Sequence, residues 1–202
     1  MLPIGLVILG AGASSRMGRP KLLLPWRGTT VVGHIIDQWR ELGAVQIAVI
    51  QRENDSALTA ELDRLNIPQS DRVKNPHAER GMFSSILCAA NWNGWRDDLK
   101  SFAIALGDQP QVRLETLRGL LTCHSEHPEA VCQPEYQSRG RHPVLLPRSI
   151  FSELKHTKAG TLKDFLKQIP RSSVQYRVDD AALSLDLDTP EDYIEAMTHF
   201  SA

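Results

Sequence analysis

The chain has 202 residues, of which 42% are hydrophobic and 23% are charged, and its formal net charge at pH 7 is −1. This length fits one domain with a sizeable apolar core. The balanced charge excludes the basic surface of a nucleic-acid-binding protein, and no apolar run is long enough to cross a membrane. An odd number of cysteines without metal-ligand spacing, and a start without a charged leader, indicate a cytoplasmic protein.

The most informative segment follows the first predicted strand. An apolar run from Ile4 to Leu9 predicts a strand that is buried on both faces. It ends in six small residues, from Gly10 to Ser15. Small side chains let backbone N–H groups approach an anion closely, so this loop is a candidate phosphate site. Arg16 and Lys21 follow in the same loop, and two fixed cations beside a bed of amides suit a triphosphate.

Two other glycine-rich phosphate loops do not fit this segment. The dinucleotide fingerprint needs a third glycine or an alanine where the chain has Ser15, and an acid at the end of the second strand, where the chain has Gln51. The Walker A loop needs Gly-Lys-Ser/Thr at its close, but Lys21 follows Pro20. A turn that merely needs glycine does not explain the two cations.

The loop resembles the signature of the MobA-like nucleotidyltransferases, and within them the molybdenum cofactor cytidylyltransferases. The chain reads L-G-A-G-A-S-S-R-M-G-R-P-K-L-L-L-P, against L-A-A-G-x-S-x-R-M-G-x-x-K in that branch, and departs once, at Gly10. The guanylyltransferase branch carries paired glycines and an Asp before the Lys. Ala11-Gly12 and Pro20-Lys21 stand here instead, which favours CTP over GTP.

This resemblance implies a set of site residues. The nucleotide-binding residues implied in the loop are Leu9, Gly10, Ala11, Gly12, Ala13, Ser14, Ser15, Arg16 and Lys21. Arg16 and Lys21 are also implied as catalytic residues.

Helix and strand patterns alternate after the loop. A helix is expected from Val31 to the stop at Gly43, capped by the threonines before it, then a strand over Val45–Ile50. A second helix is expected over Ser56–Leu65 and a short strand around Val73. This order predicts a parallel sheet with helices on both faces, and ligands at the C-terminal strand ends.

Residues 75–86 read N-P-H-A-E-R-G-M-F-S-S-I. Gly81 interrupts the chain, and Ser84 or Ser85 can cap the helix that follows. The resemblance implies that this segment lies against the nucleotide base, with Gly81 and Ser85 contacting cytosine and Asn75 bracing the loop. The stretch over residues 92–98 is interpreted as a surface connection.

A buried strand over Phe102–Leu106 runs directly into Gly107-Asp108-Gln109-Pro110. An acid at the C-terminal end of such a strand, beside a phosphate loop, is a candidate Mg²⁺ ligand, because Mg²⁺ takes one or two carboxylates together with phosphate oxygens. The alternative is an Asp-initiated turn before the helix that starts near Leu114. The resemblance identifies Gly-Asp-Gln-Pro as the metal motif of the family and Asp108 as catalytic.

The segment over residues 138–146 resembles the family's G-x-P-V segment, which closes over the acceptor. Gly140 and His142 are therefore implied as acceptor-binding, although a histidine beside proline is more often structural. The arginines that flank Gly140 could hold an anionic acceptor or be solvated. Residues 159–161, Ala-Gly-Thr, lack the Asp and Arg of the family's G-D-x-G-A-R, which weakens the inference about the acceptor.

Residues 185–192 read L-D-L-D-T-P-E-D. Thr189 as N-cap and Pro190 at the first helical position account for the second half of this motif. Asp186 and Asp188 alternate with leucines, so both would share one face of a strand. The family's D-x-D-T-P-E-D implies Asp188 as the second metal ligand, with Asp186 as an alternative.

The sequence therefore predicts one nucleotidyltransferase domain over residues 1–202, with a nucleotide-binding half over about 1–112 and an acceptor-binding half over about 113–202. The expected fold is a three-layer α/β/α sandwich with a mostly parallel, Rossmann-like sheet of the GT-A-like nucleotidyltransferase type.

By resemblance, the expected reaction is the Mg²⁺-dependent transfer of CMP from CTP to a molybdopterin-type phosphate acceptor, with release of pyrophosphate. A molybdoenzyme or its chaperone is an implied partner. One alternative is a cytidylyltransferase for another phosphorylated small molecule. A second is a non-catalytic protein that binds the nucleotide or the cofactor. A Rossmann-type oxidoreductase is disfavoured by Ser15 and by the missing ribose acid.

Overall fold

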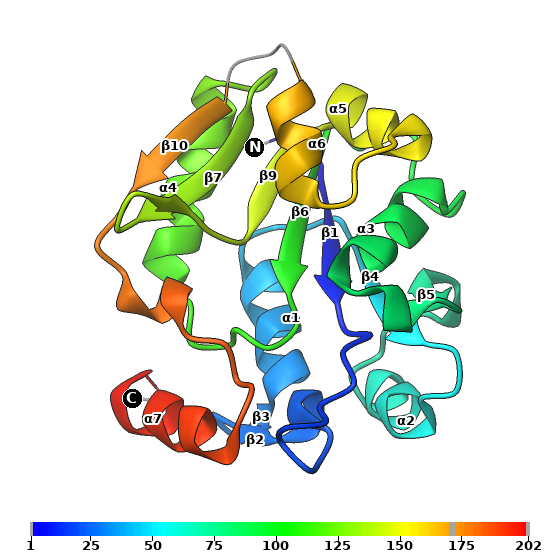
Figure 1. Ribbon diagram of the computed structural model, residues 1–202, viewed down its shortest axis with the longest axis vertical. Coiled ribbons are helices and arrows are strands. Elements are labelled where there is room, and N and C mark those ends of the chain that lie inside the picture. Colours follow the sequence, from blue (N-terminus) through cyan, green and yellow to red (C-terminus); the bar gives the residue numbers. More distant parts are fainter. Residues whose placement is uncertain (1, 170–172, 201–202) are drawn as a thin grey trace.

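A mostly parallel sheet runs through the structure, a computed structural model that describes residues 2–169 and 173–200. The strand order is β10-β7-β9-β6-β1-β4-β5, with β8 paired to β7 (Figure 1). The strands of this sheet are β1 (Ile4–Leu9), β4 (Gln46–Arg52), β5 (Arg72–Asn75), β6 (Ser101–Leu106), β7 (Val131–Tyr136), β8 (Arg139–Gly140), β9 (Val144–Pro147) and β10 (Ser173–Arg177).

The helices connect these strands and cover both faces of the sheet. They are α1 (Val31–Glu41), α2 (Ser56–Arg64), α3 (Met82–Asn91), α4 (Leu114–Glu126), α5 (Arg148–Glu153), α6 (Leu162–Gln168) and α7 (Pro190–Phe200). A separate hairpin consists of β2 (Pro25–Trp26) and β3 (Thr29–Thr30).

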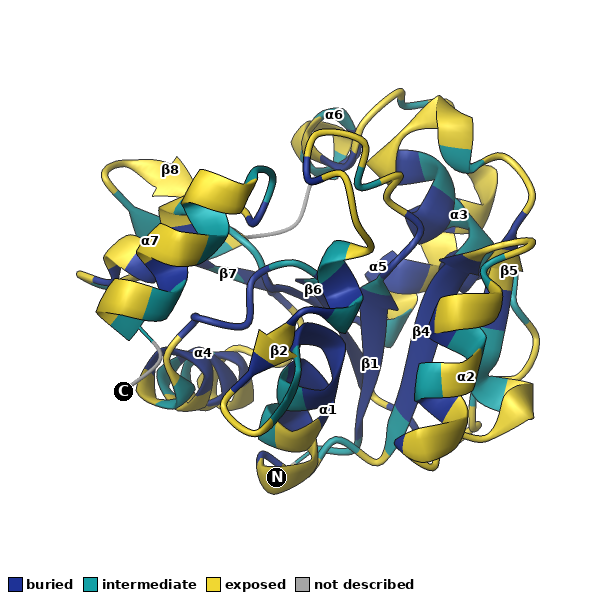
Figure 2. Ribbon diagram, turned by 90° about the horizontal axis from the view of Figure 1, so that it is seen from below, coloured by how far each residue is buried: buried dark blue, intermediate teal, exposed yellow. Residues whose placement is uncertain are grey.

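The central strand β1 shows why the molecule has three layers. Leu6 and Ile8 belong to the apolar cluster that packs α1, α2 and α4 against one face. Val7, between them, belongs to the cluster that packs α3, α5 and α6 against the other face. Side chains alternate across a strand, so a continuous apolar run serves two cores. Figure 2 shows the sheet buried between helices that expose one side. The expected α/β/α fold is confirmed.

The C-terminal ends of β1 and β6 are held unusually close. The strands pair in parallel, and beyond the ladder the Gly107 N–H donates to the Leu9 carbonyl at 3.1 Å. A Cβ on Gly107 would lie 2.7 Å from that carbonyl oxygen, so only glycine allows this approach. The contact brings Asp108 to the first residues of the glycine-rich loop.

Two local expectations are wrong. In the first, helix α3 begins at Met82, directly after Gly81 with its φ of +85°, so Ser84 and Ser85 lie inside the first turns and do not cap the helix. The expectation for residues 92–98 is confirmed, because they form an irregular and mostly exposed connection. Trp95 anchors this connection by packing edge-on against Phe102 at 4.9 Å between ring centroids.

The second wrong expectation concerns the two acids near the C-terminus. Residues 185–188 are irregular in the described backbone, not a strand, and the Asp188 N–H donates to the Asp186 carbonyl at 2.8 Å. This tight turn removes the alternation that would place both acids on one face. The two side chains consequently have different partners.

The hairpin and α7 were not expected to touch, but the structure joins them. The Tyr193 hydroxyl on α7 donates to the Pro25 carbonyl on β2 at 2.6 Å. Thr189 caps α7 as expected, because its hydroxyl accepts from the Asp192 N–H at 3.2 Å. The edge strand β10 was also not predicted from the sequence.

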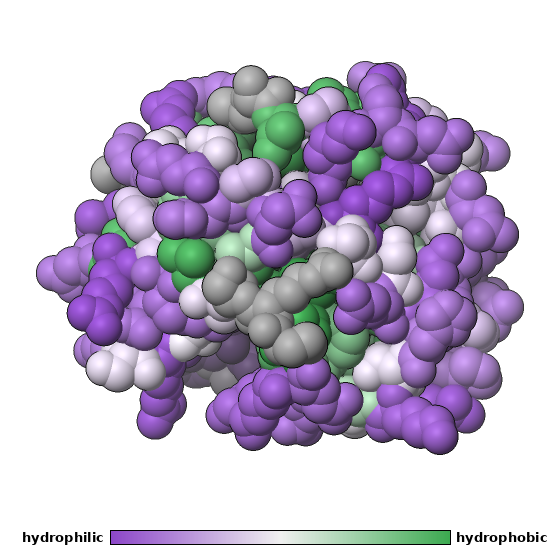
Figure 3. Space-filling model, turned by 90° about the horizontal axis from the view of Figure 1, so that it is seen from above, coloured by the Kyte–Doolittle hydropathy of each residue, from purple (hydrophilic) through white to green (hydrophobic). Residues whose placement is uncertain are grey.

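The outer surface agrees with the composition. The face seen from above Figure 1 is mostly hydrophilic, with hydrophobic side chains confined to small patches (Figure 3). Within residues 2–169 and 173–200, no helix combines the length and the apolar character that a membrane span requires.

One histidine links folding to pH. His34 on α1 packs against Trp26, with ring centroids 6.3 Å apart, and its Nε2 is buried without a partner among the described residues. Burial, followed by the positive charge of Arg27, lowers the pKa of His34 from 6.5 to about 4. As the pH falls, His34 is therefore protonated in the unfolded chain before it is protonated in the folded chain.

We predict that the free energy of unfolding of the wild type falls, relative to His34→Gln, as the pH drops from about 6.5 to about 4. The neutral form of His34 stabilises the fold above this window, and protonation of the unfolded state removes that contribution. Urea unfolding at a series of pH values measures the effect. The contributions of carboxylates cancel in the difference, because both proteins contain the same carboxylates. Parallel curves for the two proteins would contradict the prediction.

Candidate active site

The glycine-rich loop leaves β1 at Gly10 and folds back on itself before Lys21. Ser14 makes this possible, because its hydroxyl accepts from the Lys21 N–H at 3.2 Å while its carbonyl accepts from the Met17 N–H, also at 3.2 Å. Ser14 adopts a left-handed φ of +50°. Gly10 to Ala13 line a cleft of about 340 Å³, whose wall they share with the ends of β1 and β6, whereas Ser14 and Ser15 line a neighbouring cavity.

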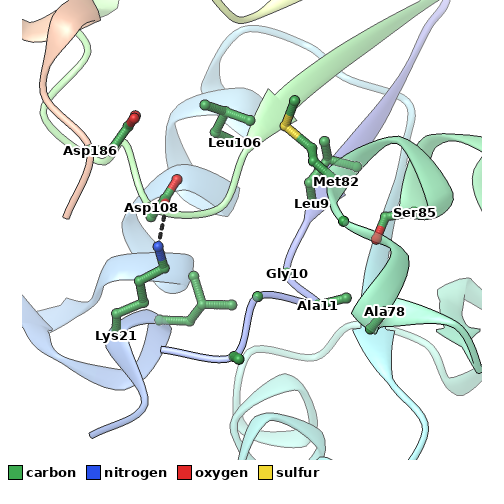
Figure 4. A pocket seen from close by; sticks show the side chains of 14 residues that line it. Leu9, Gly10, Ala11, Lys21, Ala78, Met82, Ser85, Leu106, Asp108 and Asp186 are labelled. Atoms are coloured by element: carbon green, nitrogen blue, oxygen red, sulfur yellow. Dashed lines mark hydrogen bonds and ion pairs between the residues drawn. The ribbon is translucent and has the colours of Figure 1, made fainter. Parts of the chain in front are cut away.

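The ammonium group of Lys21 lies between two carboxylates. Its Nζ donates to Asp108 Oδ2 and, at 3.1 Å, to Asp188 Oδ1. Figure 4 shows Lys21 and Asp108 pointing toward each other at the cleft. Burial alone would lower the pKa of Lys21, but the charges and hydrogen bonds of Asp108 and Asp188 outweigh burial and raise it. Lys21 is therefore a permanent cation at the end of the loop.

Arg16 completes this cluster from the outside. Its Nη2 donates to Asp188 Oδ2 at 2.7 Å. The Arg16 side chain is 68% exposed, whereas Lys21 is only 12% exposed, so Arg16 lies at the rim and Lys21 within. The predicted cations and the two predicted metal ligands thus converge, although Asp188 is far from the others in sequence.

Asp186 lines the same cleft but has a different partner. Its Oδ1 accepts from Gln109 Nε2 at 2.8 Å. Burial, and then the negative charge of Asp108, raise the pKa of Asp186. Gln109 therefore occupies one oxygen of Asp186, whereas both oxygens of Asp188 face the cations Lys21 and Arg16.

The opposite wall of the cleft is braced by Asn75. The Asn75 amide is buried and donates to Ser84 Oγ at 2.8 Å and to Ser85 Oγ at 2.9 Å, while its oxygen accepts from the His77 N–H at 2.8 Å. Gly81 and Ser85 line the cleft. Asn75 therefore fixes the turn that carries them.

A second cavity of about 800 Å³ adjoins this cleft at Met82, which lines both. Gly140 and His142 line the second cavity. A Cβ on Gly140 would lie 2.4 Å from Gln133 Nε2, so a side chain at this position would displace the end of Gln133. His142 Nδ1 lies 3.1 Å from the Ile104 carbonyl, and burial lowers the His142 pKa. His142 is thus tied to β6 as well as to the cavity.

The family of this chain follows from a comparison with known proteins. The model of the MobA-like NTP transferase domain matches residues 6–174, a range that includes the loop, Asp108 and the residues that line the second cavity. The chain belongs to the MobA-like NTP transferase family. It is therefore a nucleotidyltransferase, of the type classed as EC 2.7.7.

Relatives within this family carry different names. The nicotine blue oxidoreductase of Paenarthrobacter nicotinovorans is 29% identical, over 92% of both chains. The molybdenum cofactor cytidylyltransferase of Escherichia coli K12 is 22% identical, over 100% of this chain and 99% of the other.

The fold also matches a solved structure closely. The crystal structure of Rv0371c from Mycobacterium tuberculosis has a TM-score of 0.73 and 27% identity, and the match covers 98% of both chains. A second structure of that protein, with a TM-score of 0.68, is of its complex with manganese. Nucleotidyltransferases of this family commonly use a divalent metal.

The acids of this chain fit such a metal as a pair. No group of three or more His, Cys, Asp or Glu residues in the described part of the chain is arranged to hold an ion. Two carboxylates, Asp108 and Asp188, share one cation, Lys21 Nζ. Such a set suits Mg²⁺, which takes one or two carboxylates and completes its shell with phosphate oxygens and water. The assignment of these residues to metal and nucleotide stays a prediction.

Sequence reasoning missed the side chains that assemble the site. Gln109 was visible in the Gly-Asp-Gln-Pro motif but received no role, although it binds Asp186. Lys163 and Lys167 of α6 line the second cavity, and no sequence signal connected them to it. Their position depends on how α6 packs against the sheet.

We predict that Lys21→Ala and Arg16→Ala each lower turnover on the order of 10²–10³-fold, because each removes a preorganised cation from the loop. Nucleotide-dependent release of pyrophosphate measures turnover, and circular dichroism checks the fold. Lys100→Ala is the matched control, since Lys100 is an exposed cation that directly precedes the N-terminal end of β6, whereas the site lies at the C-terminal end. Near-normal turnover in both loop variants would contradict the assigned roles.

Proposed function

We propose that this nucleotidyltransferase moves CMP from CTP to a terminal phosphate of a molybdenum-bearing pterin cofactor and releases pyrophosphate. The observation that supports this best is the convergence of Lys21 and Arg16 with Asp108 and Asp188 at the glycine-rich loop. The name of the full-length relative from Escherichia coli supports the nucleotide and the acceptor. The Ala11-Gly12 pair in the loop also favours CTP over GTP.

The loop would hold the triphosphate. Backbone N–H groups of residues 10–15 would bind the β- and γ-phosphates, as other small-residue loops do. Lys21 and Arg16 would neutralise charge on the α-phosphate and on the departing pyrophosphate. Ion pairs with Asp108 and Asp188 already hold both cations beside the loop.

The cleft would hold the nucleoside. Its walls are mostly apolar, and Ser85 contributes a hydroxyl near the base position. Because Asn75 donates to Ser85 Oγ, the hydroxyl proton of Ser85 is left to donate to an acceptor on the base. Cytosine presents such acceptors on its pairing edge. Gly81 would add backbone groups to this recognition.

Asp108 and Asp188 would hold Mg²⁺, with Asp186 as the weaker alternative. The bound metal would neutralise negative charge on the phosphate oxygens at the reacting centre. Lys21 has both acids as partners in the structure, so it would exchange part of these contacts for phosphate oxygens.

The second cavity would hold the acceptor. Four basic side chains and no acidic one line it within the described residues. The basic residues are Arg139, Arg141, Lys163 and Lys167. An acceptor phosphate is already ionised at neutral pH, so it attacks without a general base, and alignment and charge neutralisation are sufficient. Gly140 and His142 would contact the acceptor there.

Oxidoreduction is a second candidate, because the first relative is named an oxidoreductase. The ion cluster of Lys21, Asp108 and Asp188 favours nucleotidyl transfer, since hydride transfer does not require paired carboxylates facing a fixed cation. The two activities have different products, so one set of assays separates them.

We predict that Asp108→Asn abolishes the strengthening of CTP binding by Mg²⁺, because the variant lacks one of two metal-binding charges. Calorimetric titration with and without EDTA measures this difference. Asp37→Asn is the matched control, since Asp37 is an exposed acid on α1. Unchanged titrations for Asp108→Asn would remove this residue from the metal site.

The function itself is tested by incubating the protein with each NTP and with a molybdopterin-type acceptor, a polyol phosphate or no acceptor. We expect pyrophosphate release with CTP and the pterin acceptor, and at least about tenfold less with GTP, which corresponds to about 1.4 kcal/mol. Release with the polyol phosphate alone would favour another cytidylyltransferase. Oxidation of NAD(P)H without any pyrophosphate would support the oxidoreductase instead, and nucleotide binding without turnover would indicate a non-catalytic protein.

A further inference from the structure

The segment that carries Asp188 lies outside the sheet. Residues 180–188, called the aspartate segment below, pass from β10 to α7 as a short 3₁₀ turn followed by irregular chain. Backbone ladders of a sheet therefore do not set the position of this segment. Buried Leu183 and Leu187 hold the segment on the apolar core, and its polar contacts with residues 108–116 set its register.

These contacts form an antiparallel series. At one end, Thr116 Oγ1 donates to the buried Asp180 carboxylate at 2.7 Å. At the other end, the Leu187 N–H donates to the Asp108 carbonyl at 3.2 Å. Residue numbers rise along one segment as they fall along the other. Residues 108–116 and the aspartate segment are thus held in one register, and Asp188 follows directly after the last contact.

Gln111 lies in the middle of this series. Its side chain is buried, and Nε2 donates to the Ala182 carbonyl at 3.1 Å and to the Leu185 carbonyl. Gln109 adds a bond from Nε2 to Asp186 Oδ1 at 2.8 Å. The Gln111 amide therefore satisfies two backbone carbonyls that straddle the turn of the aspartate segment.

We infer that Gln111 is a positioning residue for the metal site: through the aspartate segment it sets where Asp188 stands relative to Asp108. This rests on the proposed function, in which both acids hold Mg²⁺. Without the amide donors, the Leu185 carbonyl would lose its Gln111 partner and the Ala182 carbonyl would keep only the Leu185 N–H at 3.4 Å, so the segment would open toward water. Asp188 would then lose its place, while the glycine-rich loop would stay intact.

The other flank of Asp188 is anchored independently. Tyr193 on α7 donates to Pro25 of the hairpin, and the Asp192 carboxylate accepts from the Asp188 N–H at 3.2 Å. A change at Gln111 should therefore displace the aspartate segment without releasing α7. The expected defect is local, which makes it separable from global unfolding.

The test uses Gln111→Met, which keeps the length of the side chain and removes its donors. Gln46→Met is the matched control, because Gln46 Nε2 also bridges two acceptors, the Gly94 carbonyl at 2.9 Å and Asp71 Oδ1 at 3.2 Å, at the opposite end of the sheet. Hydrogen exchange of the Leu187 amide reports the segment directly. Titration of Mn²⁺ in the presence of CTP, followed by the electron paramagnetic resonance of free Mn²⁺, reports the metal site.

In Gln111→Met, we expect faster exchange at Leu187 and weakening of Mn²⁺ affinity by about 10- to 100-fold, as for other residues that orient metal ligands. CTP affinity in EDTA should stay unchanged, because the loop is intact. In the Asp188→Asn background, Gln111→Met should cause little further loss, since both changes act through one carboxylate. Gln46→Met should change neither readout.

Several results would overturn the inference. Unchanged exchange at Leu187 would show that Gln111 does not hold the segment, and faster exchange with normal Mn²⁺ affinity would show that the segment does not position the metal site. Full additivity with Asp188→Asn would also contradict it. If Gln111→Met does not fold, Gln111→Asn, which keeps the donors on a shorter chain, must show the same loss in smaller degree. Absence of CTP-dependent Mn²⁺ binding in the wild type would instead refute the proposed function, while the exchange result would still stand.

Discussion

The candidate active site is built around one ion cluster, in which Lys21 faces Asp108 and Asp188 from the end of the glycine-rich loop. Taking such charges out of water costs free energy, and buried ion pairs are weak contributors to stability. A fold that needed only stability would fill this place with apolar side chains. The cluster fits a preorganised arrangement of charge for a reaction of phosphates. Fixed charged groups stabilise the charge that develops in the transition state more strongly than water does.

The cluster requires three chain segments to meet at the C-terminal ends of the central parallel strands. The parallel strands β1 and β6 end side by side, and Gly107 allows the closest approach because it carries no Cβ. This brings the loop and Asp108 together through the geometry of the sheet. Asp188 arrives by a different route, along a segment held by side-chain amides instead of strand pairing. The site therefore combines a rigid half with a half that relies on individual hydrogen bonds.

The two cavities differ in the chemistry of their lining residues. The cleft at the loop is mostly apolar apart from its charged end, which suits a nucleoside with its phosphates at the mouth. The adjoining cavity is basic, which suits an anionic acceptor. Met82 belongs to both, so the two reactants would meet beside α3. In the proposed reaction, this arrangement would bring two anions together without a general base, and the nearby His142 lies 3.1 Å from the Ile104 carbonyl.

The sequence by itself determined the parts that local patterns encode. Alternating apolar runs and helical periods predicted the α/β/α layers, and small residues followed by Arg16 and Lys21 predicted the phosphate loop. Asp108 was also predictable, since a parallel sheet places the end of a buried strand beside that loop. Only the tertiary structure decided the rest. Asp186 and Asp188 do not share a strand face, and the contacts of Gln111 and the basic lining of the second cavity join residues that are distant in sequence. Single hydrogen bonds and ion pairs between distant residues leave no periodic trace in a sequence, because their geometry exists only after the layers have packed.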